Sequence, residues 1–378
     1  MSMKSYTKTI LYLFLASVIC GSIHAQTKTD ALQAILQQKI DSVRAAIDIP
    51  SMAFSCVLPS GEQISVASGM KPEQRMLAGS TGKTFFSSLA LQLIKDGKLS
   101  LDEKVSIYLG KESWYNKIQN ADAITIRQLM NHTSGVEEYY ELGDFMQRLR
   151  NEPDKTWTPA ECIAYTFGRP PLFVAGSAWS YADTNYLILG LVIEKLLKDD
   201  AYKVIQRNFI SSNSLKNTEA SVKRKLDNQV VGISGPSSPF GISGPVLVNG
   251  QMLINPQFEW AGGGYISNTI DLARWARIYY DASFLSDALR TEMRKGVPAK
   301  TGKNHEYGLG MQIRPSSLGV SYGHGGWFPG YLTEIDFFPD KKLAVAIQLS
   351  TDDFQKLKRG PRFYEMFFTT EVAKHLAP

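Results

Sequence analysis

Cysteine and histidine are scarce in this chain. Its 378 residues include 3 Cys and 5 His. Beyond residue 20 the cysteines are Cys56 and Cys162, which are too few for a disulfide framework but leave one bridge open. The histidines stand at positions 24, 132, 305, 324 and 375, and no pair has the spacing of a helical or finger-type metal site. A zinc site is therefore not expected.

A strong charge of one sign is also missing. The chain has 41 Lys and Arg against 36 Asp and Glu, which gives a formal net charge of +5. No basic run interleaved with aromatic residues stands out. Because such a run is the usual footprint of nucleic-acid binding, a nucleic-acid partner is not expected.

Apolar runs long enough to cross a bilayer are absent as well. The run Ile10–Ile19 has about ten residues, whereas a spanning helix needs roughly twenty. Lys4 and Lys8 precede this run and small residues lead from it to Ala25, a pattern typical of an export signal. We predict a signal peptide over residues 1–25 and a periplasmic or secreted mature chain without a stable membrane span. Lipoprotein anchoring through Cys20 is not expected, because the residues before it fit that pattern poorly.

Strand patterns occur near both ends of the chain, and helical patterns lie between them. Asp30 to Ala46 reads as an amphipathic helix, and Arg362 to Leu376 as a closing helix. The expected strands are Met52–Leu58, Glu62–Ser68, Tyr307–Ile313, Val320–His324, Tyr331–Phe338 and Leu343–Ser350. These patterns predict an α+β fold: an antiparallel sheet built from both chain ends, flanked by helices, with an inserted, mostly helical lobe. The α/β lobe would comprise residues 26–96 and 261–378, the helical lobe residues 97–260, and the active site would lie between them.

The most informative motif is Ser80-Thr81-Gly82-Lys83. Ser-x-x-Lys also occurs at residues 5–8 and 68–71, so the spacing alone means little. At Ser80, however, the motif opens a strongly apolar-periodic segment that ends near Gly97, which predicts a buried helix with Ser80 at its N-terminus. A helix would hold the hydroxyl and the amine on one face, where the amine can take the hydroxyl proton. The free N–H groups of the first turn would favour an oxyanion there.

Two other motifs compete for the same loop. Gly82-Lys83-Thr84 ends like a phosphate-binding P-loop, but the first glycine of that motif would fall at Leu77. Residues 78–82 also approach the Gly-x-Ser-x-Gly nucleophile elbow, which would make an α/β-hydrolase with Ser80 and His324. The elbow needs a preceding core strand, and residues 73–76 are too short and polar for one.

The chain resembles the serine β-lactamase and penicillin-binding protein superfamily. The similarity rests on Ser80-x-x-Lys83, Tyr181-Ala182-Asp183 and His324-Gly325-Gly326, in that order. Supporting stretches are residues 129–135, 181–190, 261–264 and 271–274. The most similar branch is the class C β-lactamase-like group, which includes D-alanyl-D-alanine carboxypeptidases, D-aminopeptidases and esterases.

This resemblance implies roles for particular residues. Ser80 would be acylated, Lys83 would help to remove its proton, and Tyr181 would act as partner base and protonate the leaving group. His324 would lie on the strand that lines the cleft and polarise Tyr181 or a substrate carboxylate. The backbone N–H groups of Ser80 and Trp327 would form the oxyanion hole. Asp183, Gly325 and Gly326 would contact the substrate.

Three positions depart from the pattern of many relatives. In many relatives the third of the three motifs begins with lysine. The sequence Lys300-Thr301-Gly302 would fit that form, but it lies in a polar turn, so we assign the third motif to His324-Gly325-Gly326. Asp183 stands where β-lactamases usually have asparagine. A carboxylate beside Lys83 would favour the ammonium form, which moves the base role toward Tyr181 and disfavours efficient β-lactam hydrolysis. The indole of Trp327 would either narrow the cleft or pack into the core.

The sequence thus predicts an exported serine hydrolase that works through an acyl-enzyme on ester or amide bonds, with no metal or organic cofactor. The expected partners are small-molecule or peptide substrates: D-amino-acid peptides, β-lactams or small esters. The alternative is a non-catalytic or slowly acylated ligand-binding protein of the penicillin-binding type. The Gly, Pro and Ser-rich residues 231–257, in which Gly-Ile-Ser-Gly-Pro occurs twice, would form either a wall of the cleft or a passive surface loop.

Overall fold

The computed structural model of the chain describes residues 28–376. The predicted signal peptide and Cys20 lie outside the described residues. Within residues 28–376, no helix has the length and apolarity needed to cross a membrane.

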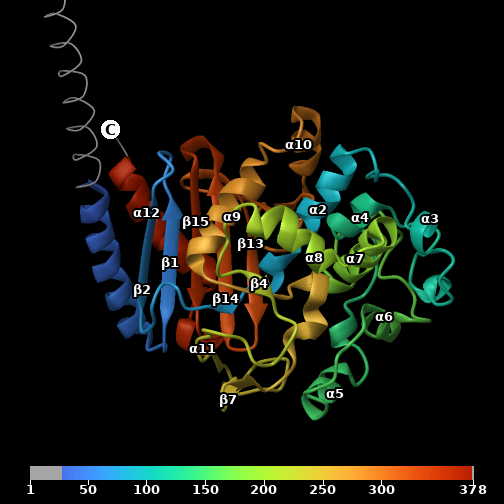
Figure 1. Ribbon diagram of the computed structural model, residues 1–378, viewed down its shortest axis with the longest axis horizontal. Coiled ribbons are helices and arrows are strands. Elements are labelled where there is room, and N and C mark those ends of the chain that lie inside the picture. Colours follow the sequence, from blue (N-terminus) through green and yellow to red (C-terminus); the bar gives the residue numbers. More distant parts are fainter. Residues whose placement is uncertain (1–27, 377–378) are drawn as a thin grey trace, which may run out of the picture.

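An eight-stranded antiparallel sheet forms one side of the molecule (Figure 1). Its order is β10-β11-β12-β13-β14-β15-β1-β2. The two ends of the chain meet inside it, because β1 (Met52–Val57) pairs along its length with β15 (Leu343–Leu349). The other strands are β2 (Gln63–Ser68), β10 (Val297–Pro298), β11 (Glu306–Tyr307), β12 (Gln312–Ser316), β13 (Gly319–Phe328) and β14 (Tyr331–Phe338). The predicted α+β fold is confirmed, and the α/β-hydrolase alternative is wrong, because that fold needs a mainly parallel sheet.

Helices cover both faces of the sheet. The alternation of β15 decides which face packs on which helix, since successive side chains of a strand point to opposite sides. Ala344 and Ala346 face the core that contains α9 (Thr269–Asp281), which Figure 1 shows in front of the sheet. The larger side chains of β15 face α12 (Pro361–Leu376) and the N-terminal helix, residues 28–47. Small residues thus let α9 approach closely, while Val, Ile and Leu fill the opposite core.

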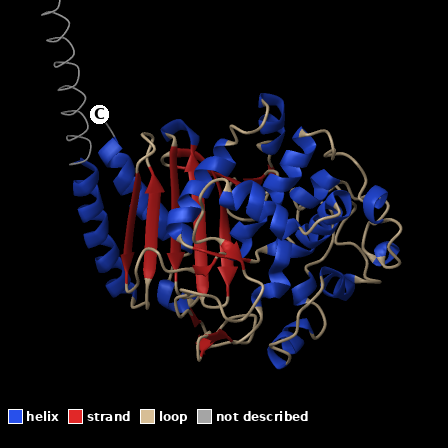
Figure 2. Cartoon of the chain, viewed as in Figure 1, coloured by secondary structure: helices blue, strands red, loops and turns tan. Residues whose placement is uncertain are grey.

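Residues between β3 (Met76–Leu77) and β9 (Tyr265–Ser267) are mostly helix and loop, which agrees with the prediction for residues 97–260. Figure 2 shows most of these helices gathered beside the sheet. The division into two lobes stays a prediction. The main helices of this part are α2 (Lys83–Lys95), α3 (Ser106–Leu109), α4 (Ile126–Met130), α5 (Phe145–Asn151), α6 (Pro159–Ile163), α7 (Asp183–Leu197) and α8 (Ala201–Ile205). The segment also contains the two-residue strands β4 (Glu219–Ala220), β5 (Ile233–Ser234), β6 (Gly244–Pro245), β7 (Leu247–Val248) and β8 (Gln251–Met252).

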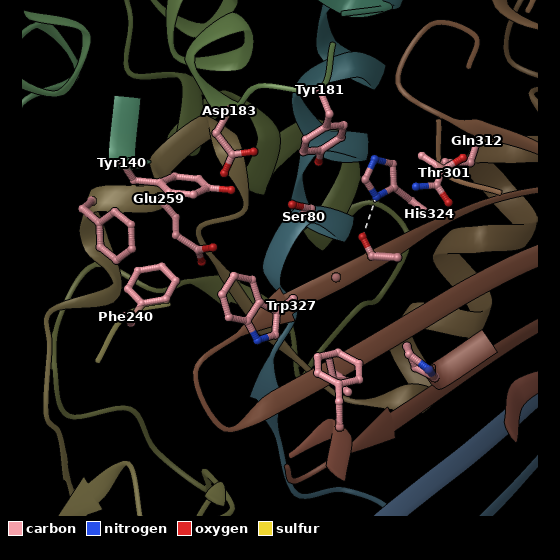
Figure 3. A pocket seen from close by; sticks show the side chains of 16 residues that line it. Ser80, Tyr140, Tyr181, Asp183, Phe240, Glu259, Thr301, Gln312, His324 and Trp327 are labelled. Atoms are coloured by element: carbon pink, nitrogen blue, oxygen red, sulfur yellow. Dashed lines mark hydrogen bonds between the residues drawn. The ribbon is translucent and has the colours of Figure 1, made fainter. Parts of the chain in front are cut away.

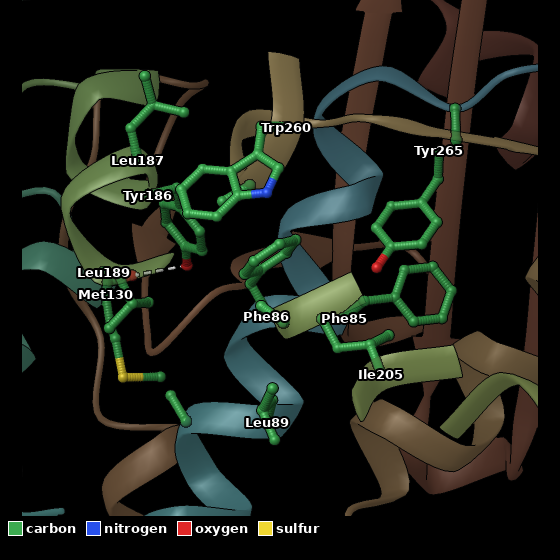
Figure 4. Close-up of a cluster of buried hydrophobic side chains, with 14 of the residues drawn as sticks. Phe85, Phe86, Leu89, Met130, Tyr186, Leu187, Leu189, Ile205, Trp260 and Tyr265 are labelled. Atoms are coloured by element: carbon green, nitrogen blue, oxygen red, sulfur yellow. Dashed lines mark hydrogen bonds between the residues drawn. The ribbon is translucent and has the colours of Figure 1, made fainter. Parts of the chain in front are cut away.

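Helix α2 is enclosed on several sides, as its apolar periodicity predicts (Figure 4). Phe85 stacks on Trp275 with ring centroids 4.4 Å apart, and Phe86 meets the edge of Trp260 at 5.6 Å. Aromatic pairs of this kind add roughly 0.5–1.5 kcal/mol each to the gain from burial. The helix that begins at Lys83 is therefore held rigidly by its neighbours.

The structure corrects two expected strands and answers whether Cys56 and Cys162 are bridged. The single strand expected over Tyr307–Ile313 is divided into β11 and β12, because Gly310 adopts φ +73° and its backbone lies against Ser87. Strand β13 runs on to Phe328, beyond the expected end at His324. Cys56 and Cys162 are both free and belong to different cores, so they form no bridge.

The repeated pentapeptide of the loop region has a structural explanation. The first copy contains β5 and the second ends in β6, and the two pair antiparallel through Ile233 with Pro245 and Ser234 with Gly244. Phe240 lies between the copies and lines the cavity described below. The expected long loop is therefore a small β-ladder that carries part of the cavity wall.

Candidate active site

Ser80 lies on a short helical turn, η1 (Gly79–Gly82), directly before α2. The turn is positioned by β3, which pairs with β9, and by β13, whose backbone lies against it. Gly79 adopts φ +53°, and a methyl group there would lie 2.6 Å from the backbone nitrogen of Trp327. Only glycine permits this contact, which brings the backbones of Ser80 and Trp327 into the same corner of the site.

The ammonium of Lys83 is fully buried and has three acceptors. Its Nζ donates to Ser80 Oγ at 2.9 Å and to Asp183 Oδ1 at 2.5 Å, and also to the carbonyl oxygen of Gly262. Three acceptors match the three N–H groups of an ammonium. Ser80 Oγ accepts one of these bonds, so its own proton is free to point elsewhere. The sequence prediction that Ser80 and Lys83 lie side by side is thus met by the geometry.

Tyr181 lies above this pair, and Figure 3 shows its hydroxyl pointing toward Ser80. The Lys83 Nζ is 4.8 Å from the centroid of the Tyr181 ring. Burial and the neighbouring Asp183 raise the pKa of Tyr181 well above its usual value, and the nearby Ser80 hydroxyl offsets only part of this rise. The phenol has no hydrogen-bond partner of normal geometry. Tyr181 is therefore protonated at neutral pH and has a proton to donate.

His324 lies on β13 and is held by a buried chain of hydrogen bonds. The backbone N–H of Ala182 donates to Nδ1 of His132 at 3.3 Å, so the proton of neutral His132 is on Nε2, which contacts Tyr307 Oη at 3.3 Å. Tyr307 then donates to His324 Nε2 at 2.8 Å, and His324 Nδ1 donates to the Gly325 carbonyl at 2.7 Å. Burial and the charge of Lys83 lower the pKa of His324 to about 3. His324 is a neutral side chain whose two nitrogens are both engaged.

Carboxyl groups crowd around the single lysine. Asp183 opens α7, and its backbone N–H donates to Glu138 Oε2 at 2.5 Å. Burial and the charge of Asp183 raise the pKa of both Glu138 and Glu259 well above the usual value. Burial also raises the pKa of Asp183, although Lys83 acts against it. Burial and crowding therefore favour the protonated, neutral forms of Glu138 and Glu259.

These residues line one cavity of about 370 Å³. Of the predicted site residues, Ser80, Tyr181, Asp183, His324, Gly325, Gly326 and Trp327 line it, and Lys83 lies just behind Ser80. The indole of Trp327 contacts Phe240, with ring centroids 5.3 Å apart, and its Nε1 donates to Asp352 at 2.9 Å. The indole lines the cavity and is also packed against both hydrophobic cores, so each of the two expectations holds in part. In residues 28–376 no group of three or more His, Cys, Asp or Glu side chains could hold a metal ion.

Sequence reasoning missed several members of the site, although each adjoins a stretch that it used. Glu259 lies two residues before the Ala261–Gly264 stretch, and Glu138 lies three residues after Gly135. His132, which lies inside the supporting stretch 129–135, has φ +60° and belongs to the hydrogen-bonded chain that holds His324. Thr301, from the turn between β10 and β11, lines the cavity as well.

Comparison with known proteins identifies the family. The family model described as beta-lactamase matches residues 36–364. The chain belongs to the beta-lactamase family. This family has the β-lactamase and penicillin-binding-protein fold and consists of hydrolases, as the sequence resemblance predicted.

Individual relatives share little sequence identity with this beta-lactamase family member. A penicillin-binding protein of Bacillus subtilis (strain 168) is 23% identical over 276 residues, which cover 71% of this chain and 59% of the relative. The chain thus spans less than two thirds of that relative's length. An N-acetylmuramyl-L-alanine amidase of the same organism is 24% identical over 323 residues, with coverage of 74% and 68%.

Solved structures match over most of the chain. A D-stereospecific amidohydrolase from Streptomyces sp. superposes with a TM-score of 0.75 and 27% identity, covering 86% of this chain and 96% of that one. A D-amino acid amidase from Ochrobactrum anthropi SV3 gives 0.73 at 19% identity, with coverage of 92% and 97%. The similarity to the D-amino acid amidase shows that the two chains share a fold.

Proposed function

We propose that this member of the beta-lactamase family is a serine hydrolase that forms an acyl-enzyme at Ser80 and cleaves ester or amide bonds without a metal or organic cofactor. The observation that carries this proposal is the 2.9 Å contact between Lys83 Nζ and Ser80 Oγ at the wall of a cavity. A hydroxyl next to a buried amine is the arrangement needed to activate a serine.

The proton path follows from the contacts of Lys83. Asp183 takes a proton from the Lys83 ammonium, and the resulting amine accepts the Ser80 proton as Oγ attacks the substrate carbonyl carbon. Burial makes Asp183 a better proton acceptor than an exposed aspartate. Tyr181, a phenol at neutral pH, then protonates the leaving group and regains its proton from Lys83, which is reprotonated by Asp183. The proton of Ser80 thus ends on the leaving group, and water repeats the sequence in deacylation.

The negative charge on the carbonyl oxygen needs donors in the transition state. The backbone N–H groups of Ser80 and Trp327 are our candidates, because the glycines between η1 and β13 bring the two backbones together. His324 would support the edge of the oxyanion hole through its hydrogen bonds. It would not bind an anion, because it is neutral and both of its ring nitrogens have partners.

Gly326→Ala tests the oxyanion hole. A methyl group at Gly326 would lie 2.0 Å from the carbonyl oxygen of Ala78, so β13 must move away from η1. We expect kcat for p-nitrophenyl acetate to fall by about 10²–10³-fold, the usual effect of losing one donor. Gly360→Ala is the control, because a methyl group there meets no atom within 4 Å. Equal rates for both variants would remove Trp327 from the proposed hole.

The candidate substrates are D-amino-acid peptides or amides, β-lactams and small esters. The amidohydrolase from Streptomyces and the amidase from Ochrobactrum, named as D-stereospecific and D-amino acid enzymes, support amides of D-amino acids among these. Intact-mass analysis after exposure to a fluorophosphonate and to penicillin tests the proposal. We expect one covalent adduct on Ser80 with the fluorophosphonate, and wild-type protein without such an adduct would contradict the mechanism.

A second candidate function is a slowly acylated ligand-binding protein, and the ion pair between Lys83 and Asp183 is the observation that favours it. If Asp183 suppresses turnover by holding Lys83 charged, Asp183→Asn should raise kcat. Under the proton path given above, the same variant should lower kcat by about 10²-fold, as for loss of a general acid or base. Initial rates with p-nitrophenyl acetate decide between the two directions.

Export is part of the proposal. Its support is the leader pattern of residues 1–25 together with the penicillin-binding relatives.

A further inference from the structure

Glu259 is a buried carboxyl group that the acyl-transfer steps do not use. It lies on η6 (Pro256–Gly262), is 5% exposed, and lines the same cavity as Ser80. Figure 3 shows its carboxyl group pointing into the cavity, between Asp183 and the indole of Trp327. Its Oε2 is buried and has no hydrogen-bond partner. An orphaned acceptor of this kind is costly unless a ligand completes it.

The charges around Glu259 indicate the sign of that ligand. Asp183, Glu138 and Glu259 lie near one buried cation, Lys83, whose three N–H groups go to Ser80, Asp183 and the Gly262 carbonyl, so none of them reaches Glu259. A cation next to Glu259 would favour the ionised form of its carboxyl group. Among the described residues that line the cavity there is no lysine or arginine. A second cation brought by the ligand would compensate the excess of carboxyl groups, whereas an anion would find no charged partner.

The wall next to Glu259 is aromatic. Tyr140, Phe240 and Phe258 line the cavity there, and the ring of Phe240 lies 6.1 Å from Tyr140 and 6.0 Å from Phe258. Aromatic faces attract cations and accept apolar side chains. The wall therefore suits an ammonium group attached to an apolar residue.

These observations disfavour the candidate substrates that carry a carboxylate. Penicillins and peptides that end in a carboxylate carry a negative charge close to the bond that is cut. The described lining offers such a carboxylate uncharged donors, among them Ser80 and Thr301, and a neutral His324, but no cation. An amino acid amide or ester with a free amino group carries the opposite charge.

We propose that Glu259 binds the protonated amino group of the substrate's acyl part, so that the preferred substrates are amides or esters of amino acids with a free amino terminus and an apolar side chain. This inference rests on the proposed acylation of Ser80 and names the substrate class of that reaction. Glu259 would bind the ammonium group, with Tyr140 and Phe240 on either side of the substrate. Ser80 would attack the carbonyl carbon, which is bonded to the carbon that carries the ammonium group.

A binding experiment tests the inference without turnover. Ser80→Ala is titrated calorimetrically with phenylalaninamide, as each enantiomer, and with N-acetylphenylalaninamide, which keeps the shape but lacks the positive charge. We expect the free amine to bind about 10- to 100-fold more tightly, the range for a hydrogen bond to a charged group. Equal affinities would overturn the inference, and this comparison needs no change at Glu259.

The Glu259→Gln variant then assigns the effect to this residue. In the Ser80→Ala background it should remove most of the preference for the free amine. The control is Glu112→Gln, which deletes the same charge from a surface pair with Lys195 and should keep the preference. A preference that survives Glu259→Gln would place the ammonium elsewhere.

The proposed acylation of Ser80 and the proposed role of Glu259 are tested separately. With Ser80 intact, fluorophosphonate labelling and p-nitrophenyl acetate hydrolysis report on acyl transfer, whatever the charge of the substrate. An inert Ser80 with selective amine binding would overturn the hydrolase proposal, whereas an active Ser80 with no amine selectivity would overturn the role of Glu259.

Discussion

Lys83→Met is expected to lower kcat/KM for p-nitrophenyl acetate by about 10⁴–10⁶-fold, the range seen when a member of a catalytic unit is removed. Methionine keeps the length of the side chain and removes the amine that contacts Ser80 Oγ. Without this amine, the proposed proton path between Ser80, Asp183 and Tyr181 is interrupted. Initial rates with this ester and with nitrocefin measure the loss.

The control for Lys83→Met separates chemistry from folding. Removing Lys83 leaves Asp183 buried without its partner, and breaking a buried pair costs about 3–5 kcal/mol of stability. Ser80→Ala keeps that pair, so it should lose activity to a similar extent with little change in the unfolding midpoint. Undiminished turnover in folded Lys83→Met would contradict the lysine mechanism.

Asp336→Ala is expected to lower the free energy of unfolding by about 3–5 kcal/mol, because it breaks a buried charge network. Asp336 lies on β14, fully buried, 3.0 Å from Arg314 and in contact with Arg362 of α12. Arg314 also pairs with Glu334 at 2.5 Å, and Glu365 has its pKa raised by burial to about 8. Loss of Asp336 removes the carboxylate that pairs with both Arg314 and Arg362.

Chemical denaturation measures this change through the midpoint and slope of the transition. Asp287→Ala is the matched control, since Asp287 pairs with Arg290 but is 96% exposed. An exposed pair contributes about 0–1 kcal/mol. If the two variants unfold at the same denaturant concentration, the network under α12 does not stabilise the fold.

The sequence predicts most of the fold, because long periodic segments carry their own signal. The closing helix was expected at residues 362–376 and lies at Pro361–Leu376. Failures occur where a distant backbone decides the local conformation. Gly310 interrupts the expected strand because it packs against Ser87, a contact more than 200 positions away that no local pattern contains.

The sequence predicts those site residues that belong to short motifs. Ser80 and Lys83 share one helical turn, so their contact follows from spacing. Glu259 could not be found in the same way. Its importance depends on burial beside Asp183 and on an unpaired oxygen, and both are properties of the folded chain.

The pairing of β1 with β15 sets the order in which this chain can fold. The contact between Ser51 and Ser350 joins residues 299 positions apart, so the middle of the sheet cannot close until nearly the whole chain is available. Closing so large a loop makes the nucleus slow to form. A nascent chain would thus leave the β15 side of β1 unpaired until late in synthesis, and a truncation before residue 343 would leave that side as an open edge that invites aggregation.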